Sequence, residues 1–255
     1  MSSSLSSTIV ETPVAKLPLP RVVWITGAGT GIGRSLAAVF SEGGDLIAAS
    51  SRKKHNLKSL RRAIENAGGT CEVFPCDVRN EAQVRKTAGL IRKKLRRVDV
   101  LVNNAGITYF KDFVSTSIRE FDNVLATNLR GLFLTTRTVL PSMIKRKKGL
   151  VINILSFAAK TVYTKSAAYS ASKSGAEAMM NVLRAETRDS GVKIINVYPG
   201  AVLTPMWQKH HRKKYAAKML NTSSVARCVY ETSIQEPSLM VEEVIIRPQG
   251  GDLRV

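Results

Sequence analysis

The stretch Thr26–Gly33, which reads T-G-A-G-T-G-I-G, decides the fold of this chain. It follows an apolar run at residues 21–26, R-V-V-W-I-T, which has the length and composition of a buried strand. It opens a segment in which Ile32, Leu36 and Phe40 lie on one face of a helix. A glycine-rich turn between a strand and a helix lets the backbone approach a pyrophosphate and presents unpaired helix N–H groups to it. The stretch therefore predicts a dinucleotide-binding turn formed by Gly27, Gly29, Thr30, Gly31, Ile32 and Gly33.

Beyond this turn, apolar runs of strand length alternate with segments of helical periodicity, which is typical of βα units around a parallel sheet. Further strands are expected at residues 46–50, 71–75, 98–102, 150–155, 192–197 and 239–246. The longer helices are expected at residues 118–145, despite Pro141, at 166–190 and, more briefly, at 223–234. The sequence thus predicts one α/β Rossmann domain over residues 21–255, with a doubly wound, mostly parallel seven-stranded sheet flanked by helices. Residues 200–221 are expected to form a substrate lid, and residues 1–20 a flexible leader.

The composition excludes several classes of protein. Of the 255 residues, 44% are apolar and 23% are charged, which excludes a disordered chain, a collagen and a disulfide-bonded framework. No run approaches the roughly 18 apolar residues that a membrane span needs. The three cysteines are an odd number without metal-ligand spacing, and the N-terminal residues lack an apolar signal core. These features indicate free thiols and a cytoplasmic location.

The charge of the chain is strongly positive. There are 39 Lys and Arg residues against 19 Asp and Glu residues, which gives a net charge of +20. Such a charge attracts nucleic acid, an acidic carrier protein, an anionic membrane surface or a phosphorylated small molecule, and it does not distinguish among them. Basic runs at residues 92–97 and 145–148 leave open a second class of function, a basic module that either binds RNA or acts as an NADP-responsive partner protein. No aromatic residues interleave with these runs, so no specific nucleic acid partner is expected.

The end of the second predicted strand indicates which dinucleotide binds. Proteins that use NAD place an acidic residue there to bond the adenosine ribose. This chain instead has Ser51, Arg52 and Lys53. The guanidinium of Arg52 matches the oxygens of a 2′-phosphate, and no carboxylate repels that phosphate. The predicted cofactor is therefore NADP(H) rather than NAD.

Tyr169 and Lys173 form a Y-x-x-x-K pattern on a predicted helix, so both side chains project from the same face. A phenol is a weak acid at neutral pH, and a neighbouring ammonium lowers its pKa by stabilising the phenolate. Ser156 ends the fifth predicted strand, at the sheet edge where doubly wound folds bind their ligands. Together these residues indicate acid–base catalysis.

On these motifs the chain resembles the short-chain dehydrogenase/reductase family over residues 21–246. Besides the glycine turn and Ser156, the resemblance rests on C-D-V at 76–78, N-N-A-G at 103–106, Asn128, Y-S-A-S-K at 169–173 and P-G-A-V-L-T at 199–204. It implies a reductase in which Tyr169 protonates a carbonyl oxygen and Ser156 hydrogen-bonds the same oxygen. It further implies that Lys173 binds the nicotinamide ribose and lowers the pKa of Tyr169, while Asn128 positions a water in a proton relay.

The same resemblance extends the cofactor site. It implies that Asp77 and Val78 lie near the adenine, and that Asn104, Ala105 and Gly106 follow the adenosine side. It also implies that the nicotinamide is surrounded by Pro199, Gly200, Val202 and Thr204.

Substrate selection is expected to depend on residues that flank this site on loops. They are Tyr109, Ser156, Phe157, Tyr163, Met206 and Trp207. The basic run at residues 208–214, Q-K-H-H-R-K-K, is interpreted as a solvated surface or as a patch that steers an anionic substrate. Its two histidines have no other candidate ligands nearby, so no metal site is expected.

Several relatives with these motifs reduce 3-oxoacyl groups on acyl carrier protein, and others reduce a variety of carbonyl compounds. The predicted substrate is a small-molecule carbonyl compound, with acyl thioesters included, and a 3-oxoacyl-(acyl-carrier-protein) reductase is the alternative. The ending V-E-E-V-I-I-R-P-Q-G-G-D at residues 241–252 departs from that alternative. Relatives commonly assemble through the helices corresponding to residues 118–145 and 166–190, so a homo-oligomer, either a dimer or a tetramer, is expected.

Overall fold

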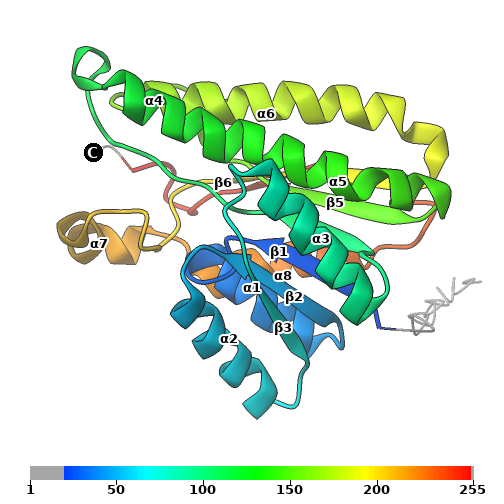
Figure 1. The fold of residues 1–255 in the computed structure, drawn as a ribbon. Coiled ribbons are helices and arrows are strands. Elements are labelled where there is room, and N and C mark those ends of the chain that lie inside the picture. Colours follow the sequence, from blue (N-terminus) through cyan, green and yellow to red (C-terminus); the bar gives the residue numbers. More distant parts are fainter. Residues whose placement is uncertain (1–19, 254–255) are drawn as a thin grey trace, which may run out of the picture.

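The chain forms a seven-stranded sheet with helices on both faces (Figure 1). The computed structural model describes residues 20–253. The strand order is β3-β2-β1-β4-β5-β6-β7, and every neighbouring pair is parallel. The strands are β1 (Val22–Thr26), β2 (Leu46–Ser51), β3 (Cys71–Pro75), β4 (Val100–Asn103), β5 (Gly149–Ile154), β6 (Val192–Pro199) and β7 (Glu243–Ile246). The predicted doubly wound α/β sheet is confirmed, and it is wholly parallel within the described residues.

The order of the strands reverses beside β1. The chain builds β1, β2 and β3 toward one edge and then returns to place β4 on the other side of β1. Helices on the two sides of this switch point diverge, so a crevice opens at the carboxyl ends of β1 and β4. The glycine turn lies at that position, immediately after β1.

Two apolar cores hold the helices against the sheet. The helices are α1 (Gly31–Glu42), α2 (Lys54–Asn66), α3 (Glu81–Leu95), α4 (Ile118–Leu125), α5 (Gly131–Lys145), α6 (Ala167–Glu186), α7 (Lys209–Tyr215) and α8 (Thr222–Ser233). One core packs α1, α2 and α8 on one face of the sheet. The other packs α3, α5 and α6 on the opposite face (Figure 1). The predicted helical stripes become these buried faces.

The long helix predicted at residues 118–145 is present but is interrupted. A capping box between Ser117 and Glu120 starts α4, and Pro141 is accommodated inside α5. Between α4 and α5, residues Ala126–Arg130 form a π-helical segment that contains Asn128. Such segments are rare and often occur at functional sites.

Three predicted boundaries need correction. Residues 200–221 are not a plain loop, because they contain α7 and a 3-10 turn at Ala216–Lys218. The last strand begins at Glu243 rather than 239, because the ammonium of Lys193 binds the main-chain carbonyls of Glu236 and Leu239 and draws this segment out of the sheet. The helix predicted to reach 190 ends at Glu186 and continues as a 3-10 turn. The predicted leader, apart from Pro20, lies outside the described residues.

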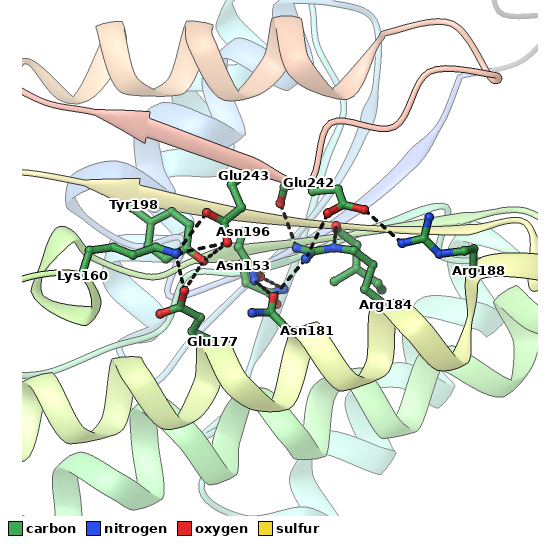
Figure 2. Close-up of polar contacts among 11 residues, drawn as sticks. Asn153, Lys160, Glu177, Asn181, Arg184, Arg188, Asn196, Tyr198, Glu242 and Glu243 are labelled. Carbon is green, nitrogen blue, oxygen red and sulfur yellow. Dashed lines mark hydrogen bonds and ion pairs between the residues drawn. The ribbon is translucent and has the colours of Figure 1, made fainter.

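A row of asparagines crosses the centre of the sheet. Asn103, Asn153 and Asn196 are in register on β4, β5 and β6, and all three are buried. Asn103 donates to Asn153 and Asn153 donates to Asn196, each over 3.0 Å. Asn196 then donates to Asn181 of α6 over 3.1 Å (Figure 2). This row ties the sheet to the helix that carries Tyr169 and Lys173.

No helix within residues 20–253 has both the length and the apolar character needed to cross a bilayer.

Candidate functional site

A large cleft opens at the carboxyl edge of the sheet, with a volume of about 1200 Å³. Its wall is built by the glycine turn, the ends of β2, β4, β5 and β6, the start of α6, the lid segment and the C-terminal tail. The structure thus brings nearly all of the predicted site residues together. The exceptions are Gly33, Tyr109 and Asn128, which do not line the cleft.

The glycine turn has the shape of an anion cradle. Gly27 and Gly31 have φ values of +65° and +57°, which favour glycine. A Cβ on Gly27 would lie 2.9 Å from the Cα of Ala105, so a side chain there would not fit. Gly33 is buried beneath the turn, where a Cβ would collide with the side chain of Asn104 and with the Gly27 carbonyl. Gly33 therefore serves close packing, while the other glycines face the cleft.

The first turn of α1 is open to an anion. The helix begins at Gly31, and in the described structure neither an acidic residue nor a side-chain cap occupies its N-terminus. Its N–H groups and dipole therefore favour a negatively charged group in the cleft. Asn104 braces the turn by donating to the carbonyls of Thr26 and Gly27 over 2.9 and 3.2 Å.

The far end of the cleft, beyond β2, is basic. Ser51, Arg52 and Lys53 line it, and the side chains of Arg52 and Lys53 are exposed there. Asp77 is the acidic residue on this wall, and Arg79 binds both of its carboxylate oxygens, with a shortest distance of 2.6 Å. The hydrogen bond from Arg79, with a smaller contribution from the charge of Arg52, lowers the pKa of Asp77.

The sequence analysis missed the ion pair between Arg79 and Asp77, since two residues so close together in a loop carry no periodic signal. Because this guanidinium neutralises Asp77, the wall can accept a phosphate beside Arg52 without strong repulsion. Asn56 also lines this end and was not predicted.

The three polar groups predicted for catalysis meet near the centre of the cleft. Tyr169 and Lys173 lie one turn apart on α6, and the ammonium of Lys173 is 5.7 Å from the centre of the Tyr169 ring. Ser156 caps the 3-10 turn Phe157–Ala159 at the end of β5, where its hydroxyl accepts from the N–H of Ala158 over 3.1 Å. Ser156 and Tyr169 both line the cleft.

Burial shifts the pKa values of both Lys173 and Tyr169. Lys173 is 4% exposed, its ammonium donates to the Ile154 carbonyl over 2.7 Å, and burial lowers its pKa to about 8. Burial also raises the pKa of Tyr169, and the hydrogen bond with Ser156 only partly opposes that change. Desolvation of the phenolate dominates here, and the expected lowering of the Tyr169 pKa by Lys173 stays a prediction. At neutral pH the phenol is therefore protonated.

Asn128 lies behind the cleft wall. Its side chain accepts from the N–H of Ile107 and donates to the Ile107 carbonyl, both over 2.9 Å, and it also donates to Ser172. Gly106 separates it from the cleft, since a Cβ there would be 3.4 Å from Asn128 Oδ1 and 3.7 Å from Lys173 Nζ. Its predicted role in a water relay stays a prediction.

Aromatic side chains dominate the end of the cleft that lies beyond Tyr169. Phe110 and Trp207 stack with ring centres 5.0 Å apart and join the loop after β4 to the lid. Phe157, Tyr163 and Met206 also line the cleft, and their part in substrate selection stays a prediction. Tyr109 is 38% exposed and lies outside the cleft, so its assignment is wrong, and the next residue, Phe110, occupies the wall instead.

The C-terminal tail closes this end. Asp252 and Leu253 line the cleft, Arg247 pairs with Asp252 over 2.8 Å, and the Arg247 guanidinium lies 4.2 Å from the centre of the Phe157 ring. Burial and a hydrogen bond with Asp252 raise the pKa of Tyr163. The sequence analysis missed the tail, because only the path of the chain through space brings it to the cleft. Within residues 20–253 no group of three potential metal ligands occurs.

Comparison with known proteins gives this geometry a context. The family model described as short chain dehydrogenase matches residues 21–215, which is most of the chain. The sepiapterin reductase of Chlorobaculum tepidum is 31% identical over 243 residues, which cover 92% of this chain and 99% of that protein. The 3-oxoacyl-(acyl-carrier-protein) reductase of Thermotoga maritima is 33% identical over 189 residues, 74% of this chain and 77% of that protein.

A solved structure agrees with these matches. A metagenomic short-chain oxidoreductase, solved in complex with NADP, superposes with a TM-score of 0.80 at 30% identity. The superposition covers 90% of this chain and 97% of that one.

Proposed function

Because this chain belongs to the short-chain dehydrogenase family of oxidoreductases, we propose that it is an NADP(H)-dependent carbonyl reductase in which Tyr169 donates the proton. The observation that carries this proposal is the meeting of Tyr169, Lys173 and Ser156 in the cleft that begins at the glycine turn. In this proposal the catalytic domain spans residues 21–255, and residues 200–221 form the lid over its substrate.

The cleft has the features that NADP(H) requires. The glycine turn and the open N-terminus of α1 suit the pyrophosphate. Arg52 and Lys53 suit a 2′-phosphate, and Arg79 removes the repulsion that Asp77 would otherwise exert. The relative solved with NADP supports the same cofactor. When bound, NADPH supplies the hydride, and the remaining chemistry belongs to the side chains.

Each side chain has one task in the proposed mechanism. Ser156 donates a hydrogen bond to the substrate oxygen and thereby polarises the carbonyl. Tyr169 transfers its phenolic proton to the same oxygen as negative charge develops there. Lys173, with its pKa lowered to about 8, is part cation and part amine at mildly alkaline pH, so it can return a proton to Tyr169. Asn128, through the Ile107 main chain and Ser172, fixes the wall beside Lys173.

The aromatic end of the cleft supports an apolar carbonyl compound as substrate, held between the Phe110–Trp207 stack and Tyr163. A 3-oxoacyl-(acyl-carrier-protein) reductase is the second candidate. The Thermotoga maritima relative favours it, and the basic run of α7, within the lid, offers a surface for an acidic carrier. We also place the enzyme in the cytoplasm, because Cys71, Cys76 and Cys228 are free thiols.

The direct test replaces the phenol. Tyr169→Phe removes the donor and little else, so turnover of NADPH should fall by roughly 10²- to 10⁴-fold while NADPH still binds. The matched control is Tyr230→Phe, since Tyr230 packs against Phe40 on the opposite face of the sheet. Turnover is measured with a panel of 3-oxoacyl thioesters, diketones, aldehydes, quinones and ketosteroids, and a strong preference identifies the substrate class. Wild-type turnover by Tyr169→Phe, or a cellular phenotype unchanged by it, would favour the binding-module alternative.

A further inference from the structure

An ion cluster, drawn in Figure 2, includes Lys160, which ends the short turn that Ser156 begins. Its members are Lys160, Glu177, Tyr198 and Glu243. The ammonium of Lys160 binds the carboxylate of Glu177 and both oxygens of Glu243, the latter at 3.0 and 3.2 Å. It also lies 4.4 Å from the centre of the Tyr198 ring. The Tyr198 hydroxyl closes the cluster by hydrogen-bonding Glu177 over 3.1 Å and Glu243 over 3.0 Å.

The four members come from four different elements. Lys160 follows the 3-10 turn after Ser156, and Glu177 lies on α6 one turn beyond Lys173. Tyr198 is on β6, and Glu243 is the first residue of β7. In Figure 2 Lys160 reaches into the space between β7 and α6, where it meets both carboxylates. The cluster therefore connects the Ser156 loop to the helix that carries Tyr169 and Lys173.

The loop between Ser156 and Lys160 is short and held by internal hydrogen bonds, so the positions of its two ends are coupled. The hydroxyl and carbonyl of Ser156 accept from the N–H groups of Ala158 and Ala159 over 3.1 and 3.0 Å. The N–H of Lys160 donates to the Phe157 carbonyl over 2.9 Å. A displacement of Lys160 therefore moves Ser156 as well.

The charge of Lys160 is essential to the cluster. Its side chain is 28% exposed, and the two carboxylates are 15% and 35% exposed, so water screens them only partly. Burial alone would lower the pKa of Lys160, but the hydrogen bonds that its ammonium donates to Glu177 and Glu243 outweigh it and raise that pKa. Without the ammonium, the two carboxylates would repel each other across the Tyr198 hydroxyl.

We propose that Lys160 is a positioning residue that holds the Ser156 hydroxyl at the correct distance from Tyr169. This inference rests on the proposed function, because it gives Ser156 a part in turnover. The competing interpretation is that the cluster only stabilises the edge of the sheet between β6 and β7. The two interpretations differ in whether the loss of Lys160 lowers kcat by displacing Ser156.

A double-mutant cycle separates them. We compare kcat, KM and NADPH affinity of the full chain for Lys160→Met, Ser156→Ala and the double variant. If Lys160 acts through Ser156, Lys160→Met lowers kcat at least tenfold in the wild-type background and less than twofold in the Ser156→Ala background. NADPH affinity changes less than twofold, and Lys160→Arg restores most of kcat.

Two further variants keep the test informative. Lys193→Met is the matched control, since Lys193 binds main-chain carbonyls at the sheet edge, outside the cleft, and its loss should not change kcat. Glu243→Gln weakens the cluster without removing the ammonium, so it should lower kcat by less than Lys160→Met does. If Lys160→Met fails to fold, Glu243→Gln is combined with Ser156→Ala in the same cycle.

The outcomes distinguish this inference from the proposed function. If the losses of kcat caused by Lys160→Met and Ser156→Ala multiply in the double variant, the positioning role is overturned. It is also overturned if Lys160→Met lowers Tm and leaves kcat unchanged. If Ser156→Ala itself turns over at the wild-type rate, the proposed role of Ser156 fails, and the positioning role fails with it. If Ser156→Ala is slow and Lys160→Met is not, only the inference about Lys160 fails.

Discussion

At the scale of single residues, Lys173 combines almost complete burial with a charge. Its folded pKa of about 8 lies below the ordinary value of 10.5 because of desolvation. Between these two values the unfolded chain binds more protons than the folded one, so the free energy of unfolding rises with pH. Below about pH 8 both states are protonated and the full cost of burying the cation is present. The raised pKa values of Tyr169 and of the three cysteines have the opposite effect, so the contribution of Lys173 is isolated by comparison with a variant that lacks it.

This relation gives a pH prediction. From pH 7.5 to 9.5 the free energy of unfolding of the wild type should rise by about 1 to 2 kcal/mol relative to that of Lys173→Met, which lacks the titrating amine; urea unfolding measures both. Other groups contribute equally to both proteins and cancel in the comparison. They include Lys193 and the cysteines Cys71, Cys76 and Cys228, whose raised pKa values lower the free energy of unfolding as the pH rises. Parallel pH dependences of the two proteins would contradict the buried, titrating Lys173.

Arg52 decides the cofactor preference in this account. Arg52→Asp removes the partner of the 2′-phosphate and adds a repelling carboxylate, so kcat/KM with NADPH should fall about 10- to 100-fold. The value with NADH should change much less, because NADH lacks that phosphate. The matched control is Arg62→Asp, on the exposed side of α2. Equal efficiency of the wild type with both cofactors would count against the assignment.

The residues that the sequence predicted best are those with fixed spacing on one element. Tyr169 and Lys173 are one helical turn apart, and the glycines occupy one turn, so local geometry alone brings them together. Arg79 and Asp252 could not be predicted in this way. Arg79 matters because it pairs with Asp77, and Asp252 because it pairs with Arg247 at the cleft. No periodic pattern in the sequence predicts such contacts.

At the scale of elements, the asparagine row makes the central strands and α6 interdependent. Asn153 accepts from Asn103 and donates to Asn196, and it is fully buried. Asn153→Ala leaves buried amide groups without partners, so the free energy of unfolding should fall by about 2 to 3 kcal/mol. Asn66→Ala, at the exposed end of α2, is the control and should change it by less than about 0.5 kcal/mol. A urea titration measures both, and similar small losses would show that the row contributes little.

Elements with an apolar stripe were predicted, and elements without one were not. The helices that pack on the sheet have such stripes, and their boundaries agree within a few residues. Helix α7 reads K-H-H-R-K-K-Y and has no apolar face, so its sequence carries no helical signal. The π-helical segment around Asn128 depends on one extra residue per turn, which hydrophobic periodicity does not reveal.

At the scale of the whole molecule, apolar side chains remain exposed along α4, α5 and α6. Phe121, Phe133, Ile144 and Val182 are each more than two-fifths exposed. Their exposure supports the expected homo-oligomer through these helices. Light scattering at micromolar concentration should give a dimer or tetramer of the 27.9 kDa chain, and Phe133→Glu with Val182→Glu should lower that mass. Leu90→Glu, on α3, should leave it unchanged. A stable wild-type monomer would contradict this prediction.

The central claim is that the Tyr169 phenol gives its proton to the substrate oxygen. A crystal structure of the protein with NADP⁺ and a bound ketone tests it most directly. We predict that Tyr169 Oη and Ser156 Oγ both lie within hydrogen-bonding distance of the ketone oxygen. A ketone bound with its oxygen facing other groups, and the phenol directed away from it, would contradict the proposed mechanism.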